Sequence, residues 1–251
     1  VDGVFTADPR IVPSARKLDR ISYDEMLEMA ASGAKVLVLR CVEYARRYGV
    51  PVHVRSSFST HTGTLVTDRP RTTEGEVPME QPMIAGVAHD RSEAKITVVG
   101  VPDVPGKAAR IFEVVAGAGV NIDMIVQNVS VARTGLTDIS FTLPATDGPA
   151  ATAALTAHQP GIGFASLQFD DAIGKLSLIG AGMKSHPGVS ARLFAALSTA
   201  GINIEMISTS EIRISVVTRA DSLDEAVRAV HTAFDLDAET AEAVVYGGTG
   251  R

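Results

Sequence analysis

Apolar residues in the N-terminal part of the chain recur with the spacing of an amphipathic helix and then of a short strand. An apolar stripe within residues 26–30 follows the capping-box sequence of residues 22–25, and Gly33 ends the run. This pattern predicts a helix over 22–32. A second helical pattern over 36–48 ends at Gly49, and alternation over 51–55 predicts a short strand.

The remaining chain contains a sequence repeat. Residues 95–129 and 175–211 align with a two-residue insertion, and between Pro105–Val129 and Pro187–Glu211 11 of 25 positions are identical. Such a duplication predicts two copies of one supersecondary unit.

Each copy contains alternating strand patterns and helical apolar stripes in the order strand, helix, strand, strand, helix, strand. This order predicts a ferredoxin-like βαββαβ module. A second capping-box sequence at residues 222–225 opens the last helix. The expected elements are strands 96–101, 121–125, 138–143 and 165–169 with a helix at 149–158 in the first copy, and strands 176–180, 203–207, 212–217 and 243–246 with a helix at 222–234 in the second.

Residues 67–82 contain three prolines and six charged residues and few apolar ones, which is typical of a linker. We therefore expect an α+β protein with a first α/β region at 1–66, a linker at 67–92, a first module at 93–170 and a second at 171–251.

The composition excludes several classes of function. A formal net charge of -6 argues against a nucleic-acid surface, and a single cysteine, Cys41, excludes a disulfide framework and a cysteine-rich metal site. No apolar segment long enough to cross a membrane is present in the sequence, and the N-terminus lacks a signal-peptide pattern. We expect a cytoplasmic protein with no bound metal.

The loop before the first helix of each copy has the chemistry to bind an amino acid. Gly106 and Gly188 stand at helix entrances, where free backbone N–H groups can hold a carboxylate. Asp103 can pair with an ammonium group, and the side chains of Asn121, Gln127 and Asn203 add amide groups. The alternative is that Pro-Gly is ordinary turn chemistry and that Asn121 only caps a strand.

The pattern D-x-P-G, helix, G-[VI]-N-I-[DE]-M-I resembles the ACT domain, a regulatory module that typically binds amino acids at paired interfaces. The tandem arrangement, with the segments 180–188 and 207–215, resembles the regulatory half of aspartate kinase. The resemblance implies threonine and lysine as effectors, held between modules of two chains. The implied effector contacts are Asp103, Gly106, Ala108, Asn121, Ile122, Asp123 and Gln127 in the first copy, and Ser190, Ala191, Asn203, Ile204, Glu205 and Glu211 in the second.

Residues 1–10 and 32–37 resemble the nucleotide-side segments of amino-acid kinases. In that family the corresponding residues contact adenine and the ATP phosphates, which implies these roles for Phe5, Arg10 and Lys35. Phe5 replaces the usual tyrosine, and Val38-Leu39 replaces a common His-Pro, so the base contacts depart from the family pattern.

The resemblance implies phosphoryl transfer from ATP, with Mg²⁺, to aspartate by the complete enzyme. The Lys-bearing strand and Gly-Gly-Ser loop with which such kinases begin are not in this sequence, so we expect no catalytic residue, no tightly bound cofactor and no activity from this chain alone. We expect instead a homodimer formed through the ACT modules together with a catalytic subunit. Two alternatives are a nucleotide-competent portion that a partner chain completes and a purely structural pairing module.

Overall fold

The computed structural model describes residues 1–68, 83–129, 134–183 and 186–239, which fall into two compact units. Unit 1 contains Val1–Asp90, Lys175–Thr218 and the chain from Ser222 onward, and unit 2 contains Arg91–Gly174 with Arg219–Asp221. Unit 2 is therefore an insertion within unit 1.

Unit 2 is a four-stranded antiparallel sheet with two helices, and it confirms the βαββαβ module predicted for the first copy. The strand order β10-β7-β9-β8 is that of a ferredoxin-like sheet. The elements are β7 (Glu93–Pro102), α3 (Lys107–Gly117), β8 (Ile125–Val129), β9 (Leu136–Pro144), a 3-10 turn (Ala145–Asp147), α4 (Gly148–Ile162) and β10 (Ser166–Asp170).

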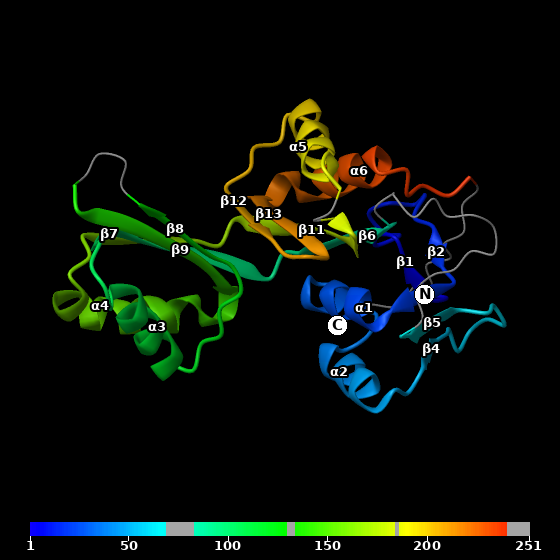
Figure 1. Ribbon diagram of the computed structural model, residues 1–251, viewed down its shortest axis with the longest axis horizontal. Coiled ribbons are helices and arrows are strands. Elements are labelled where there is room, and N and C mark those ends of the chain that lie inside the picture. The colour runs from blue at the N-terminus through cyan, green and yellow to red at the C-terminus, as the bar shows by residue number, and fades with distance from the viewer. Residues whose placement is uncertain (69–82, 130–133, 184–185, 240–251) are drawn as a thin grey trace. The chain divides into compact units, whose positions relative to one another are not determined.

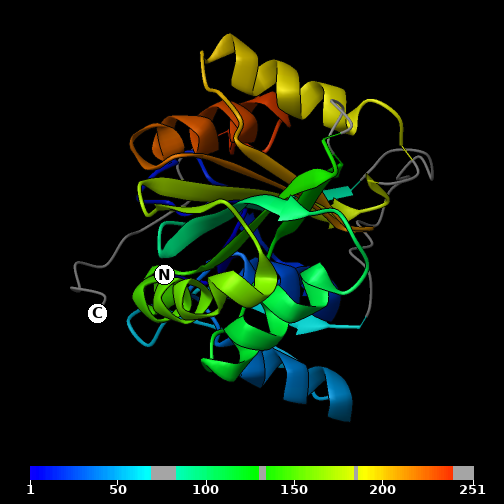
Figure 2. The ribbon, with the colours of Figure 1, turned by 90° about the vertical axis from the view of Figure 1, so that its left-hand side faces the viewer.

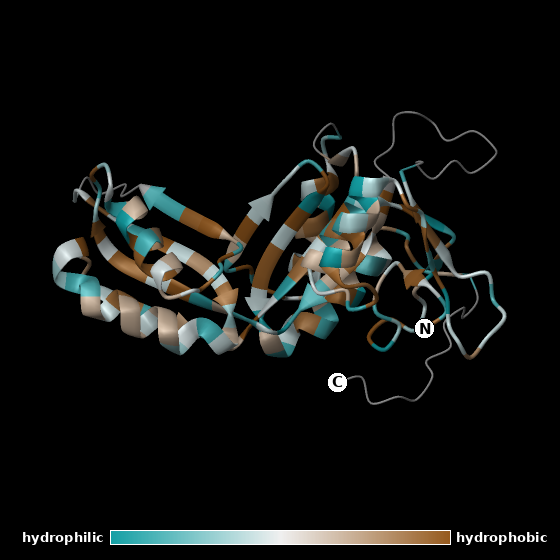
Figure 3. Cartoon of the chain, turned by 90° about the horizontal axis from the view of Figure 1, so that it is seen from below, coloured by the Kyte–Doolittle hydropathy of each residue, from teal (hydrophilic) through white to brown (hydrophobic). Residues whose placement is uncertain are grey.

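The core of unit 2 lies between this sheet and the helices α3 and α4, which cover one of its faces (Figure 1). Ile96 and Val98 of β7 face the same core as Ile111 of α3. The rings of Phe112 and Phe141 meet edge to face with centroids 5.7 Å apart. The helical stripe read from the sequence is therefore the buried face, and Figure 3 shows brown, apolar positions along the strands of this unit.

The second module of unit 1 has the same arrangement but takes one strand from elsewhere in the chain. The strand order is β12-β13-β11-β6. Its elements are β11 (Ile173–Ala181), α5 (Val189–Thr199), β12 (Met206–Thr209), β13 (Arg213–Arg219), a 3-10 turn (Ala220–Ser222) and α6 (Leu223–Ala233), with β6 (Met83–Asp90) at the edge.

Strand β6 corrects the predicted linker at 67–92, because residues 83–90 are part of this sheet. It pairs antiparallel with β11 from Lys175–Asp90 to Ala181–Met83, the position that β10 holds beside β7 in unit 2. Residues 69–82 and the predicted strand 243–246 lie outside the described residues. The predicted linker was too long because the charged, proline-rich composition of 67–82 was extended over the short apolar run that follows it.

The N-terminal region of unit 1 confirms an α/β character. It contains β1 (Val4–Phe5), β2 (Lys17–Leu18), β3 (Arg20–Ser22), α1 (Tyr23–Ala31), α2 (Leu39–Tyr48), β4 (Val52–Val54) and β5 (Thr64–Thr67). The sheet order is β3-β5-β4, with β3 and β5 parallel.

The two predicted capping boxes have different outcomes. At α1 the Ser22 hydroxyl accepts a hydrogen bond from the Glu25 N–H, and the Glu25 carboxylate accepts from the Ser22 N–H, as predicted. At α6 the prediction is wrong, because Ser222 ends a 3-10 turn with helical φ and ψ of -93° and -3° instead of the extended conformation of a capping residue.

Strand β11 is buried on both faces because the sheet of the second module lies between two layers of helices. Leu178 belongs to the core shared with α5 and α6, whereas Ile179 belongs to the core shared with α1. Figure 2 shows α5 and α6, in yellow and orange, on one side of this sheet and the blue α1 on the other. The second module and the N-terminal region are thus packed into one body.

Candidate functional site

The loops before α3 and α5 have the geometry that the repeat predicted. Gly106 and Gly188 occupy the N-cap positions with φ of 94° and 109°, which favours glycine, and a Cβ at either residue would meet no other atom within 4 Å. Glycine is therefore required here by the backbone conformation, while the space around both residues is open. The first-turn N–H groups of an α-helix have no carbonyl partner within the helix.

In the second module this loop forms one wall of a hollow of about 550 Å³. The turn between β12 and β13 also lines the hollow. A volume of this size is within the usual range for small-molecule sites, roughly 300–1,000 Å³. The lining residues are Met183, His186, Pro187, Gly188, Ser190, Thr209, Ser210, Glu211 and Ile214.

The two walls carry complementary chemistry. Gly188 and Ser190 place the amino end of α5 and a hydroxyl group on one side, where a carboxylate is favoured by hydrogen bonds and by the helix dipole. Glu211, from the turn between β12 and β13, adds a carboxylate to the lining, and a carboxylate favours an ammonium group. Such a hollow can hold an amino acid by both of its charged ends.

Only part of the predicted set in the second module lines this hollow. Ser190 and Glu211 do so. Ala191 is exposed on α5, and Asn203 is exposed in the segment before β12. Ile204 packs against the core, and the backbone N–H of Glu205 donates to the carbonyl of Val217 at 2.8 Å.

His186, Thr209 and Ser210 also line the hollow but are absent from the predicted set. The signal for His186 was present in the sequence, because residues 185–186 are the insertion that distinguishes the second copy from the first. The His186 ring is held by a hydrogen bond of 2.7 Å between Nδ1 and the carbonyl oxygen of Gly182.

In the first module the predicted residues fall on two segments. Asp103 and Gly106 are exposed in the loop before α3, and Ala108 packs against the core from the first turn of that helix. In the segment leading into β8, Asn121 and Asp123 are exposed, whereas Ile122 packs against the core. Gln127, within β8, is exposed as well.

The three predicted nucleotide contacts lie in different surroundings. Phe5 is only 6% exposed and packs in the core of the second module, which leaves little of its ring for an adenine base. The Arg10 guanidinium is paired with the Asp8 carboxylate, with Nη2 and Oδ2 2.6 Å apart. Lys35 is exposed after the end of α1.

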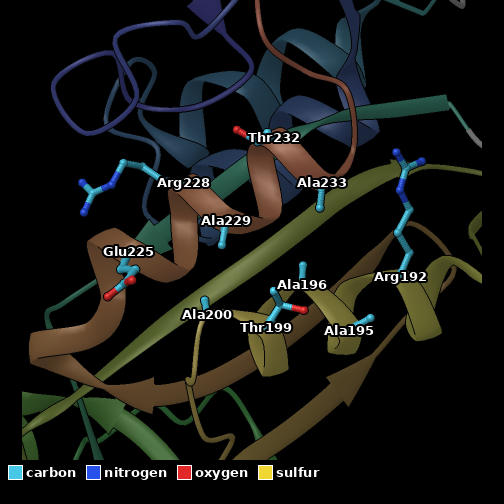
Figure 4. A pocket seen from close by; sticks show the side chains of 10 residues that line it. All are labelled: Arg192, Ala195, Ala196, Thr199, Ala200, Glu225, Arg228, Ala229, Thr232 and Ala233. Atoms are coloured by element: carbon cyan, nitrogen blue, oxygen red, sulfur yellow. The ribbon is translucent and has the colours of Figure 1, made fainter.

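A second concavity lies between the helices α5 and α6 (Figure 4). Half of its ten lining residues are alanines, among them Ala196 and Ala229, with Arg192 at one end and Glu225 and Arg228 at the other. Arg192 pairs with Asp235 at 2.5 Å and lies over the Phe234 ring. The concavity has a volume of about 720 Å³.

Within the ranges that the structure describes, we find no cluster of three or more His, Cys, Asp or Glu side chains suited to a metal ion. No helix in the same ranges has the length and apolar content needed to span a membrane.

Comparison with known families divides the chain as the fold does. Residues 1–56 match the amino acid kinase family, and residues 96–159 and 176–234 match the ACT domain. The aspartokinase of Mycolicibacterium smegmatis is 61% identical over 251 residues, which cover 100% of this chain and 58% of that relative. The chain thus spans little more than half the length of this relative.

Solved structures of aspartate kinases are similar to this chain as well. The ligand-free regulatory subunit of aspartate kinase from Thermus thermophilus is 39% identical with a TM-score of 0.58, over 61% of this chain and 99% of that one. E. coli aspartokinase III in complex with lysine and aspartate, described as the T-state, is 26% identical with a TM-score of 0.68, over 92% of this chain and 49% of that one. The duplicated βαββαβ modules, the N-terminal α/β region and these relatives lead to one conclusion: the chain belongs to the aspartokinase family.

Proposed function

We propose that this chain is the regulatory portion of an aspartokinase and that its second ACT module binds an amino acid in the hollow between Gly188 and Glu211. The observation that carries the proposal is the presence of a helix amino end and a carboxylate in the lining of one hollow of about 550 Å³. Threonine and lysine are the proposed effectors. Lysine is supported by its presence in the similar E. coli structure.

We further propose that the modules pair between copies of the chain. The strands β8 and β12 stand at the edges of their sheets. Ile125 and Ile207, at equivalent positions of the repeat, are 49% and 44% exposed. Edge strands with exposed apolar side chains favour association with a further strand.

The complete enzyme is proposed to transfer a phosphoryl group from Mg-ATP to aspartate, with a catalytic portion outside these residues. Effector binding would alter that reaction only through different affinities for two arrangements of the protein, and such couplings are typically about 1–3 kcal/mol.

Isothermal titration of the chain with threonine and with lysine tests the binding proposal, with glycine as a ligand that lacks a side chain. We expect saturable heat with threonine or lysine, and a change in sedimentation that reports pairing. The absence of both effects with both amino acids would refute the regulatory role.

The second candidate function is a nucleotide-competent portion, favoured by the exposure of Lys35 and Arg10. Acylation of Lys35 in the presence and absence of ATP distinguishes it, with Lys107 as the reference lysine. Protection of Lys35 in the isolated chain would favour this candidate, and protection only after a catalytic subunit is added would favour the regulatory role.

A further inference from the structure

A buried hydrogen-bond network connects helix α6 to the N-terminal segment of unit 1. His231 of α6 is fully buried, with its Nε2 2.8 Å from the Thr6 hydroxyl oxygen and its Nδ1 3.2 Å from the Asp237 carboxylate. The Ser14 hydroxyl donates to the same carboxylate. Residues far apart in the sequence are thus joined through one imidazole ring.

Thr6 is the meeting point of three chain segments. Its backbone N–H donates to the Arg16 carbonyl at 2.9 Å, and its carbonyl accepts from the Val87 N–H of β6 at 2.7 Å. Its hydroxyl oxygen accepts from the Arg16 N–H at 2.9 Å and lies 3.3 Å from the Leu236 carbonyl. A Cβ at Gly86 would lie 2.4 Å from the Thr6 carbonyl oxygen, so β6 approaches this segment closely.

The partners of the His231 ring determine which nitrogen carries the proton. The Asp237 carboxylate can only accept, so Nδ1 donates to it and Nε2 is left to accept from the Thr6 hydroxyl. Burial lowers the pKa of His231, and nearby Arg16 acts in the same direction, against the opposing effect of Asp237. The network is therefore built around a neutral ring.

Residues next to this network belong to the hydrophobic core whose members Met183 and Ile214 line the hollow of the second ACT module. Val227 and Val230 of α6 share one core with Val189, the residue before Ser190 at the start of α5. Phe5, which precedes Thr6, belongs to this core as well. A movement of the amino end of α5 can therefore reach α6, and through His231 it can reach Thr6.

We propose that His231 is a positioning residue that fixes the segment Val4–Arg10 to α6, so that amino-acid binding in the hollow changes the position of this segment. The fixation of the segment stands on the contacts above. The response to an amino acid rests on the proposed function.

Hydrogen exchange of the full 251-residue chain tests the fixation without any ligand. Thr6→Val removes the hydroxyl that holds the Arg16 N–H, and His231→Leu removes the ring. In both variants we expect the Arg16 amide to exchange at least about tenfold faster while the amides of β11 keep their rates. Thr6→Ser and His231→Gln keep a polar partner and are expected to restore most of the protection.

The matched control is Thr218→Val. Thr218 is a buried threonine of β13 whose hydroxyl has no hydrogen-bond partner among the described residues, so the same substitution should leave Arg16 exchange unchanged. An Arg16 rate in Thr6→Val equal to that of the unmodified chain would overturn the proposal, as would the same acceleration in Thr218→Val.

The ligand response is measured by repeating the exchange with saturating threonine or lysine beside a calorimetric titration. We expect binding to change the exchange of Thr6, Arg16 and Val87, and His231→Leu to abolish that change while the dissociation constant shifts by less than about threefold. Binding with no change at these amides, or an equal change in His231→Leu, would overturn the proposal. Absence of heat would refute the proposed function, and the ligand-free exchange rates would still decide the fixation.

Discussion

Gly33 lies so close to His89 that a Cβ at Gly33 would be 2.1 Å from the His89 carbonyl oxygen. Gly33 has a φ of 104° and follows the end of α1, and His89 belongs to β6 in the sheet of the second module. At this contact the N-terminal region packs against the sheet of the second module. Only a residue without a side chain fits at position 33.

Gly33→Ala is expected to destabilise unit 1 by more than about 3 kcal/mol, because the strain of a positive φ adds to a collision with backbone atoms. Urea denaturation followed by circular dichroism measures the change. The matched control is Gly49→Ala at the end of α2, where φ is 63° and a Cβ meets no atom within 4 Å. Only the conformational cost applies there, about 1–2 kcal/mol. Equal losses in the two variants would show that the contact with His89 is not tight.

Stability is expected to fall as the pH is lowered below about 6.5, the ordinary pKa of histidine. Burial lowers the pKa of His231 in the folded protein, so the unfolded chain binds a proton that the folded chain does not. Below the folded pKa the loss is complete. His231→Gln should flatten the dependence of the unfolding free energy on pH in this window, and an unchanged slope would exclude His231 as its source.

A second loss is expected at lower pH from Asp237. Burial opposes its ionisation, but hydrogen bonds from Ser14 and Thr232 and the neighbouring His231 lower its pKa below the ordinary value of 3.8. The stability that the carboxylate contributes is present above 3.8 and is lost as the pH falls through the folded pKa. Asp237→Asn should remove this loss, which is measured as the unfolding free energy from denaturation curves recorded at a series of pH values.

Arg213 of β13 and Glu28 of α1 form an ion pair. We expect the coupling free energy between the two side chains to be about 1 kcal/mol or more. The nitrogen and oxygen of this pair are 3.1 Å apart, and the side chains are only 15% and 26% exposed. The control pair, Arg46 and Asp24, is 55% and 56% exposed and should couple by less than about 0.5 kcal/mol. Double-mutant cycles with Arg→Met and Asp→Asn or Glu→Gln measure both, and similar values would contradict the role assigned to burial.

Glu211→Gln is expected to weaken amino-acid binding at least about tenfold, because the substitution removes the negative charge of a carboxylate that lines the hollow. Glu205→Gln should change the affinity less than about twofold, because Glu205 is not among the lining residues. Calorimetry with threonine and lysine compares the two. A larger loss of affinity in Glu205→Gln would indicate that the amino acid binds at the segment before β12 and not in the hollow.

The repeat predicted the modules well because strand alternation, helical stripes and glycine positions are local properties. It failed at β6, since no local pattern shows that residues before one module complete the sheet of the next. The strand expected at 121–125 begins at Ile125, because Asp123 and Met124 instead bond to Thr142. Register of this kind depends on long-range partners.

For the candidate site, spacing identified the Pro-Gly loops but not which residues share a hollow. Ser190 and Glu211 are brought together by the turn between β12 and β13, a tertiary contact that sequence distance does not reveal. The burial of Phe5 has the same origin, because the core around it is supplied by the second module.

Nuclear magnetic resonance of the isotope-labelled chain during titration with threonine and lysine tests whether the hollow of the second ACT module binds an amino acid. We expect saturable shifts of the amides at residues 186, 188–190 and 209–211, and a loss of these shifts in Glu211→Gln. Shifts confined to other residues, or none with either amino acid, would contradict it.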